Sequence, residues 1–576
     1  MKTILRFLKP HIGLCIAATL LTAADMVGMM LIPTFAADML NGGASGATLE
    51  ELGLTAIKMS VAALIAVVGA ILGGWVCARL SAKVGADIRK ALYEKSLDLS
   101  VYDFQSFGTA SMTTRTASDV ANIQFAVVGI FQMMLPVPVV FVAAVALTFR
   151  QDLWSGLILL GVLAIIVIVA LFVLKGASPL FRKLQKLLDR MSTVLLENLT
   201  GVRVVRAFNK EERETERLND AFTEYKVTSV KANKMFAGLD GLVNLVINLF
   251  VVLIYWIAGG RISVGAFGVG DITAIIEYAI MAMFSVYMAQ FVILSFPRAA
   301  ECSRRIGEVL DYKPQITDKT ETPLELNVGD DVMSFENVTF RYADSDVNAL
   351  ENLDFTCRRG AVTAIIGGTG SGKSTIASLM LRFNDVTSGR ITLGGADIKD
   401  MPQTQLRDNV SYVQQKAWLF SGTIAENLRY GNANATDEEL MRALDVAQAG
   451  DFVRALPDGL NSRVAQGGTN FSGGQKQRLS IARAIVKDPQ LYIFDDSFSA
   501  LDFKTDAALR KALLKEKSDK AMVIIAQRIS SIRNADEIIV LDGGKPVGKG
   551  RHEELLATCP VYAEIYESQT KEVEQR

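Results

Sequence analysis

Six long apolar stretches, all before residue 300, constrain the fold of this chain more than any other feature. They cover approximately residues 12–40, 55–79, 125–149, 153–174, 240–264 and 272–296. Each holds about the 20 apolar residues that a helix needs to cross a bilayer. A buried helix of a soluble protein is the alternative for any one stretch, but six in succession favour the membrane. The sequence therefore predicts an all-α membrane domain of six long transmembrane helices within residues 1–310.

The placement of Lys and Arg predicts how these helices are oriented. Positive charges precede the first stretch, follow the second and the sixth, and are dense between the fourth and the fifth. The loop from Asp38 to Glu51 carries none. Because positively charged loops stay on the cytoplasmic side, both termini are expected to be cytoplasmic. We expect a multi-pass protein of the cell membrane, of the prokaryotic inner-membrane type.

Two polar stretches, between the second and third and between the fourth and fifth apolar runs, have helical patterning and few breakers. At 1.5 Å per residue, helices of this length would extend tens of ångströms beyond the bilayer. Turn-prone tips lie near residues 101–109 and 207–213. These stretches are either solvated charged helices or levers whose tips dock on a cytoplasmic domain.

A linker and a second domain follow. Residues 311–331 are rich in Pro, Thr, Asp and Glu and lack an apolar period, which is typical of a linker. Over residues 332–576, short β-branched runs alternate with helical patterns. The predicted strands are Ala361–Ile366, Val410–Val413, Leu491–Phe494, Ala521–Ala526 and Glu537–Leu541. This alternation predicts an α/β domain with a largely parallel sheet.

The segment Gly367–Thr375 reads Gly-Gly-Thr-Gly-Ser-Gly-Lys-Ser-Thr, between a predicted strand and a predicted helix, Ser374–Phe383. This is the context that a phosphate-binding loop requires. Its glycines allow backbone N–H groups to surround phosphate oxygens, and the helix N-terminus adds partial positive charge. Lys373 is expected to reach the β- and γ-phosphates, and Ser374 to offer a hydroxyl to Mg²⁺. An ordinary glycine-rich turn would not account for Lys-Ser at the start of a helix.

Two further segments carry chemistry. Asp495 and Asp496 follow the predicted strand Leu491–Phe494, where a carboxylate suits a Mg²⁺ site and a second one could polarise a water molecule. The run Phe471-Ser472-Gly473-Gly474-Gln475 precedes a predicted helix, so it forms either an anion cradle or a simple helix cap.

Taken in order, these motifs resemble the ABC transporter family, specifically exporter-type half-transporters, over essentially the whole chain. The resemblance implies a P-loop ATP-binding cassette domain that binds ATP and Mg²⁺ and drives transport. The implied nucleotide-binding residues are Tyr342, Gly367, Gly368, Thr369, Gly370, Ser371, Gly372, Lys373, Ser374, Thr375, Asp495, Ser472, Gly473, Gly474, Gln475 and Asp502. The implied metal contacts are Ser374, Gln415 and Asp495, and the implied catalytic residues are Asp496, Gln527 and Gln415. The tips near 101–109 and 207–213 resemble coupling helices.

Two positions depart from the hydrolysing members of the family. Asp496 stands where they have Glu, and Gln527 stands where they have a switch His. Asp is one methylene shorter, so its carboxylate is retracted by roughly 1 Å, and misplacement on that scale can cost about a hundredfold in rate. Gln is neutral, whereas His can carry charge and move protons. The site of this chain is therefore expected to bind ATP but to hydrolyse it weakly.

The family geometry, in which each ATP lies between two chains, implies a second half-transporter as partner. We expect a heterodimer whose partner is hydrolysis-competent and uses the signature motif, Phe471–Gln475, of this chain. A homodimeric exporter with unusual catalytic residues and an ATP-gated regulatory membrane protein remain alternatives. The net charge of -1 gives no sign of nucleic-acid binding.

Intramembrane charges are candidates for the transport path. Asp25 lies within the first apolar stretch and Glu277 within the sixth. A path lined by these residues and by methionines would suit amphiphilic drugs, lipids or peptides. The five scattered cysteines form no Cys-x-x-Cys pair, and the chain has only two histidines, so neither a disulfide framework nor a zinc site is expected.

Overall fold

The computed structural model describes residues 2–262 and 268–574, which form two compact units. One unit contains residues up to Leu97 and Gly108–Tyr312. The other contains Asp98–Phe107 and the chain from Lys313 onward. The division of the chain into a helical unit and an α/β unit agrees with the fold class that the sequence predicts.

The first unit consists of helices only, within the described residues. Its elements are α1 (Lys2–Leu8), η1 (Lys9–His11), α2 (Ile12–Ala44), α3 (Leu49–Asp98), α5 (Thr109–Thr114), η2 (Arg115–Asp119), α6 (Val120–Gly129), η3 (Ile130–Met134), α7 (Pro136–Gln151), α8 (Leu153–Ala207), α9 (Glu211–Ile262) and α10 (Val269–Leu310). Among the described residues, five helical stretches are long and apolar enough to cross a membrane, and the shorter apolar stretch Leu153–Val169 lies at the fourth predicted span, 153–174. Residues 263 and 264, at the end of the predicted fifth span, lie outside the described residues.

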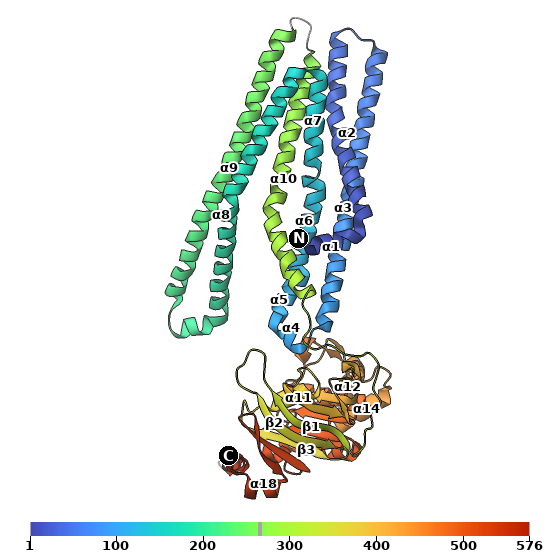
Figure 1. The fold of residues 1–576 in the computed structure, drawn as a ribbon, viewed down its shortest axis with the longest axis vertical. Coiled ribbons are helices and arrows are strands. Elements are labelled where there is room, and N and C mark those ends of the chain that lie inside the picture. Colours follow the sequence, from blue (N-terminus) through green and yellow to red (C-terminus); the bar gives the residue numbers. More distant parts are fainter. Residues whose placement is uncertain (1, 263–267, 575–576) are drawn as a thin grey trace. The chain divides into compact units, whose positions relative to one another are not determined.

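The helices α2, α3, α7 and α10 run side by side, and α8 and α9 form a long antiparallel hairpin (Figure 1). The buried core of the unit lies where α2, α7, α8, α9 and α10 meet, around Phe250 and Tyr278. The tip of the hairpin is a turn, Phe208–Lys210, in which Asn209 has φ +49°. The second predicted coupling segment, 207–213, therefore contains the end of one long helix and the start of the next, with no separate helix between them.

The first predicted tip does form a short helix, α4 (Val101–Phe107), which belongs to the second unit. The carboxylate of Asp103 is fully buried and accepts a hydrogen bond from the Gln315 amide over 3.1 Å. This contact joins a segment between two membrane helices to the start of the second unit.

The second unit is built on a six-stranded sheet with the order β12-β11-β3-β10-β9-β6. Neighbouring strands are parallel except for β11 and β12, as expected for an α/β domain. A second sheet has the order β2-β1-β4-β5, and β7 pairs with β8. The strands are β1 (Asp331–Phe340), β2 (Leu350–Arg358), β3 (Val362–Gly367), β4 (Ser388–Leu393), β5 (Ala396–Asp397), β6 (Val410–Val413), β7 (Gly422–Thr423), β8 (Arg463–Val464), β9 (Leu491–Asp495), β10 (Ala521–Ile525), β11 (Glu537–Asp542) and β12 (Lys545–Gly550).

Helices complete the second unit. They are α11 (Lys373–Met380), α12 (Gln403–Asn409), α13 (Ile424–Arg429), α14 (Asp437–Val446), α15 (Gly450–Arg454), η4 (Gly459–Asn461), η5 (Gln466–Gly468), α16 (Gly473–Lys487), α17 (Phe503–Glu516), η6 (Ile529–Ser531), α18 (His552–Thr558) and α19 (Pro560–Glu574). The central strands β3, β9 and β10 are buried along their length. Such strands read as continuous apolar runs, which is why the sequence locates them well.

The segment predicted as a linker packs against this unit. Leu324, Leu326 and Val328 contact its core. The guanidinium of Arg382, only 2% exposed, donates to the Thr317 carbonyl over 3.2 Å and pairs with Asp318. The segment is therefore extended chain that is fixed along the α/β unit.

Candidate nucleotide site

The phosphate loop joins the end of β3 to the start of α11, as the sequence predicts. Gly370 and Gly372 have φ of +81° and +93°, in the region that favours glycine. A Cβ at Gly372 would also lie 2.8 Å from the Ala349 carbonyl oxygen. A side chain at this position would therefore both strain the backbone and collide with the neighbouring chain.

Lys373 lies across the loop that precedes it. Its Nζ donates to the carbonyl oxygens of Gly367 and Gly368 over 2.8 and 2.7 Å. Burial lowers the pKa of this ammonium, while the nearby carboxylates of Asp496 and Asp495 act in the opposite direction. The loop, a buried cation and the N-terminus of α11 are thus gathered at one place, which is the arrangement that binds phosphate groups.

Asp495 ends β9 and is 4% exposed. Its Oδ1 accepts a hydrogen bond from Ser374 Oγ over 3.2 Å, and its Oδ2 accepts one from the Tyr412 hydroxyl over 3.1 Å. Burial raises the pKa of Asp495, and both hydrogen bonds act against that rise. The hydroxyl of Ser374 and the carboxylate of Asp495 converge as expected.

The donor set at this point fits Mg²⁺. Ser374 and Asp495 both offer oxygen, which is the ligand atom that Mg²⁺ prefers. Among the described residues, no group of three or more His, Cys, Asp or Glu side chains gathers as a metal cage. Mg²⁺ in such sites commonly combines one or two protein oxygens with water and substrate phosphates, so the two residues suffice as protein ligands.

Asp496 has φ +46°, an uncommon backbone conformation for a residue with a side chain. Its amide donates to the Ile525 carbonyl over 2.8 Å, and its Oδ2 accepts a hydrogen bond from Gln415 Nε2 over 2.9 Å. The structure therefore brings two predicted catalytic residues together beside the phosphate loop.

Tyr342 lies near the same loop. Its hydroxyl is 3.1 Å from Thr375 Oγ1, and its ring makes an edge contact with Phe340 at 4.7 Å between centroids. The residue is half-buried. This position is compatible with stacking on a base.

Ser472 caps α16 instead of contacting the loop. Its Oγ accepts a hydrogen bond from the Gln475 amide over 3.3 Å, and its own amide donates to Gln475 Oε1 over 2.9 Å. Within the part of the chain that the structure describes, no hydrogen bond joins Ser472 or Gln475 to the phosphate loop. Asp502 similarly caps α17 through the Thr505 amide, which lowers its pKa.

The side chain of Gln527 is exposed just after β10. Its carbonyl oxygen accepts a hydrogen bond from Gln569 Nε2 over 2.7 Å, and Gln569 Oε1 accepts one from the Ile529 amide over 2.9 Å. The helix α19 therefore holds the backbone on both sides of Arg528.

Sequence reasoning missed Tyr412 and Gln569, which touch the site from distant parts of the chain. For Tyr412, the one available signal was its place within the predicted strand Val410–Val413, where neighbouring side chains point to opposite faces of the sheet. Of the two intramembrane candidates, Asp25 is half-buried on α2 and Glu277 is exposed on α10. A Cβ at Gly69 of α3 would lie 2.8 Å from the Asp25 amide nitrogen, so these two helices are closely packed there.

A phosphate loop with an oxygen-lined cation position, on an α/β domain fused to a helical membrane unit, defines an ATP-driven membrane transporter. Residues 12–286 match the family model of the ABC transporter transmembrane region, and residues 350–499 match that of the ABC transporter. The chain belongs to the ABC transporter family and is an exporter half-transporter with an ATPase domain. It is a multi-pass membrane protein.

Relatives extend over nearly the whole chain. An uncharacterized ABC transporter ATP-binding protein of Mycobacterium tuberculosis is 36% identical over 98% of this chain and 97% of its own length. The ATP-dependent lipid A-core flippase of Desulfotalea psychrophila is 31% identical over 85% of each chain. A bacterial Atm1-family ABC exporter, solved with ATP bound, has a TM-score of 0.79 and 26% identity, with 98% of each chain covered.

Proposed function

We propose that this chain is the catalytically degenerate half of a heterodimeric ABC exporter. Its own site binds ATP with Mg²⁺ and hydrolyses it weakly, while its signature motif completes a hydrolytic site on the partner half. The observation that carries the proposal is the pair Asp496 and Gln527 at the two catalytic positions. The remaining nucleotide-binding residues are those of a complete site.

The geometry around Asp496 supports weak hydrolysis. The short side chain is held by Gln415 over 2.9 Å, on a residue with a left-handed backbone conformation. A general base must come within hydrogen-bond reach of the water that it activates. An aspartate here reaches roughly 1 Å less far than a glutamate, and displacement on that scale is costly in rate.

Gln527 supports the same reading. Its side chain is neutral at every pH, so it cannot supply the charge or the proton that a histidine could. Gln569 donates a hydrogen bond to the backbone carbonyl of Gln527, and the Gln527 side chain is exposed. A glutamine at the switch position can donate a hydrogen bond to a phosphate, but it cannot gain or lose a proton there.

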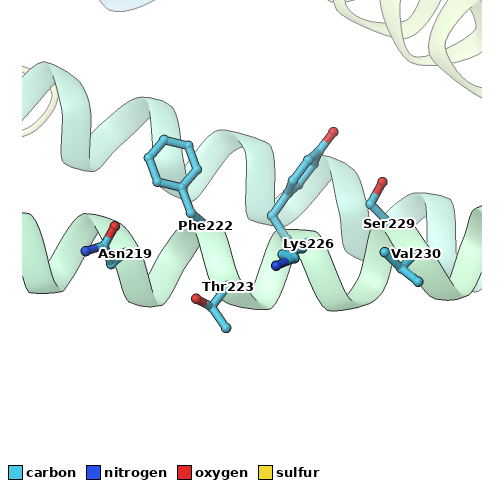
Figure 2. Close-up of a pocket in the computed structure, with 7 residues that line it drawn as sticks. Asn219, Phe222, Thr223, Lys226, Ser229 and Val230 are labelled. Atoms are coloured by element: carbon cyan, nitrogen blue, oxygen red, sulfur yellow. The ribbon is translucent and has the colours of Figure 1, made fainter.

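The long hairpin supports assembly with a second chain. Beyond its predicted membrane spans, the hairpin exposes large apolar side chains: Leu199 on α8 at 65%, Phe208 in the turn at 70% and Phe222 on α9 at 45%. Figure 2 shows a hollow on α9 in this region, with Phe222 and Ser229 projecting on one side of the helix and Thr223 on the other. Apolar surface outside the bilayer and open to water is typical of an interaction site. In the proposed heterodimer the partner half covers it.

In the proposed site, different residues bind different parts of ATP and its Mg²⁺. The loop amides and Lys373 bind the phosphates, Tyr342 stacks on the base, and Ser374 and Asp495 hold Mg²⁺, with Gln415 as a third contact. Bound Mg²⁺ would neutralise phosphate charge. The short helix α4 and the hairpin tip at 207–213 then transmit closure of the ATP-binding domains to the membrane helices. Both termini lie in the cytoplasm of a cell whose plasma membrane holds the protein.

The transported substrate is proposed to be an amphiphilic molecule, either a drug, a lipid or a peptide. Asp25 and Glu277 are the candidate contacts, because charges within membrane helices usually serve function. A relative named as a lipid A-core flippase makes lipids a reasonable first class to screen.

ATPase activity of the purified full chain, alone and together with a candidate partner half, tests the proposal. Near-zero activity alone and robust activity of the pair are expected. Strong activity of the chain alone would favour a homodimeric pump. ATP binding without transport by the pair would favour an ATP-gated regulatory protein.

A further inference from the structure

Tyr412 lies on β6, the edge strand of the main sheet, next to β9. The two strands are parallel, with Tyr412 opposite Ile493 and Val413 opposite Phe494. This register places Tyr412 close to the carboxyl end of β9, where Asp495 lies. Its hydroxyl donates to Asp495 Oδ2 over 3.1 Å.

The Tyr412 hydroxyl serves Asp495 as a hydrogen-bond donor. A carboxylate has no proton to give, so the phenol O–H donates in this contact. Since Ser374 Oγ donates to the other oxygen of Asp495, each carboxylate oxygen has its own hydroxyl, and the plane of the carboxylate is held from two sides.

The rest of the Tyr412 side chain is held by packing. Tyr412 is partly buried against the hydrophobic core that contains Val410 and Ile493. The residue also contributes to the lining of a hollow of about 290 Å³ on the α/β unit, together with Phe383 and Arg483. Packing of this kind restricts the movement of the side chain that carries the hydroxyl.

We propose that Tyr412 is a positioning residue that orients the Asp495 carboxylate for Mg²⁺ at the nucleotide site. The inference rests on the proposed binding of ATP with Mg²⁺ at this site. Residues that hydrogen-bond to metal ligands fix ligand orientation, and their loss typically costs about 10- to 100-fold in metal affinity. Ser374 and the phosphate loop bind nucleotide without Tyr412, so only the part of affinity that depends on Mg²⁺ should change.

The test compares Tyr412→Phe with Tyr492→Phe in the purified full chain. Tyr492 on β9 is buried, and its hydroxyl has no hydrogen-bond partner among the residues described. Both variants remove one phenol oxygen from neighbouring strands and keep the ring. The measured quantity is the affinity for a fluorescent ATP analogue, once with Mg²⁺ and once with EDTA.

The expected result is that Tyr412→Phe loses about tenfold of the affinity gained from Mg²⁺, with its affinity in EDTA unchanged. Tyr492→Phe should keep the whole gain. The proposal is overturned if Tyr412→Phe also keeps the whole gain, or if both variants lose it equally, since that would reflect general packing. A wild-type chain that gains nothing from Mg²⁺ would instead overturn the proposed nucleotide site, and the role of Tyr412 with it.

Discussion

Gln415 Nε2 donates a hydrogen bond to Asp496 Oδ2 over 2.9 Å. The two residues are 81 positions apart in the chain, and both belong to the predicted catalytic set. Asp496 makes this contact from a left-handed backbone conformation, with φ +46°. The contact links the residue at the position of the catalytic base to the segment that follows β6.

Restoring the family residues should reactivate the site in two steps. We expect Asp496→Glu alone to raise hydrolysis at this site little, because Gln527 still lacks a titratable group. Asp496→Glu combined with Gln527→His should raise it by roughly a hundredfold or more, the range of general acid–base effects. The measurement is phosphate release by the heterodimer whose partner half has lost its own catalytic base. Full recovery from Asp496→Glu alone would show that the base is the only defect.

Removing the cap of α16 should separate stability from catalysis. Ser472→Ala should cost about 1 kcal/mol as a lost helix cap and should also lower ATPase of the heterodimer strongly. Thr436→Ala is a matched control, because Thr436 caps α14 by the same reciprocal arrangement with Glu439. Thermal unfolding and ATPase of both variants would be compared. Equal ATPase in the two variants would contradict the shared-site proposal.

The two hydrogen bonds made by Gln569 should restrict local opening of the backbone at residues 527–530, which we call the switch segment. Gln569→Ala removes the hydrogen bonds to the Gln527 carbonyl and the Ile529 amide. We expect faster amide hydrogen exchange at residues 527–530, because local opening becomes easier. Ser568→Ala is the control, since the Ser568 hydroxyl donates to the Ile565 carbonyl of its own helix, away from the switch segment. Unchanged exchange in Gln569→Ala would mean that packing alone holds the segment.

Arg382 should contribute far more to stability than an exposed arginine of the same unit. It is 2% exposed and binds Asp318, Asp385 and two carbonyl groups. Arg382→Met should destabilise the unit by about 3 kcal/mol, as in other broken buried ion pairs, and should expose the segment near Lys319 to trypsin. Arg390→Met, which breaks the exposed pair with Glu336, should change little. Similar cleavage of both variants would contradict the prediction that Arg382 fixes the segment near Lys319.

Two buried thiols should resist alkylation in the folded protein. Burial raises the pKa of Cys357 to about 12, and burial with Asp119 raises that of Cys302 to about 11. Because the thiolate is the reactive form, neither should react with maleimide at pH 7.5. Both should react after denaturation, when their pKa values fall to the ordinary range. Ser518→Cys, at an exposed position, is the control, and labelling of the native thiols at its rate would contradict the prediction.

The sequence alone determined the class of fold and the local motifs. Apolar runs of membrane-spanning length and continuous apolar strand runs depend only on neighbouring residues, so the six-helix unit and the parallel strands around β3, β9 and β10 are confirmed. The glycines of the phosphate loop are likewise a local requirement, because their backbone conformations are set within a few residues. Helix ends were less accurate. The helix α11 stops at Met380, before the predicted Phe383. The helix α16 covers Gly473–Lys487, whereas the pattern predicted Lys476–Ile485, because the cap formed by Ser472 starts the helix earlier.

Tertiary structure alone decided which distant side chains meet. The contacts of Tyr412 with Asp495, Gln415 with Asp496 and Gln569 with Gln527 join residues 83, 81 and 42 positions apart. Whether such groups come within about 3 Å depends on strand order and register, here on β6 lying beside β9 and on α19 reaching the end of β10. No local pattern carries that information, because the spacing along the chain is unrelated to the spacing in the sheet.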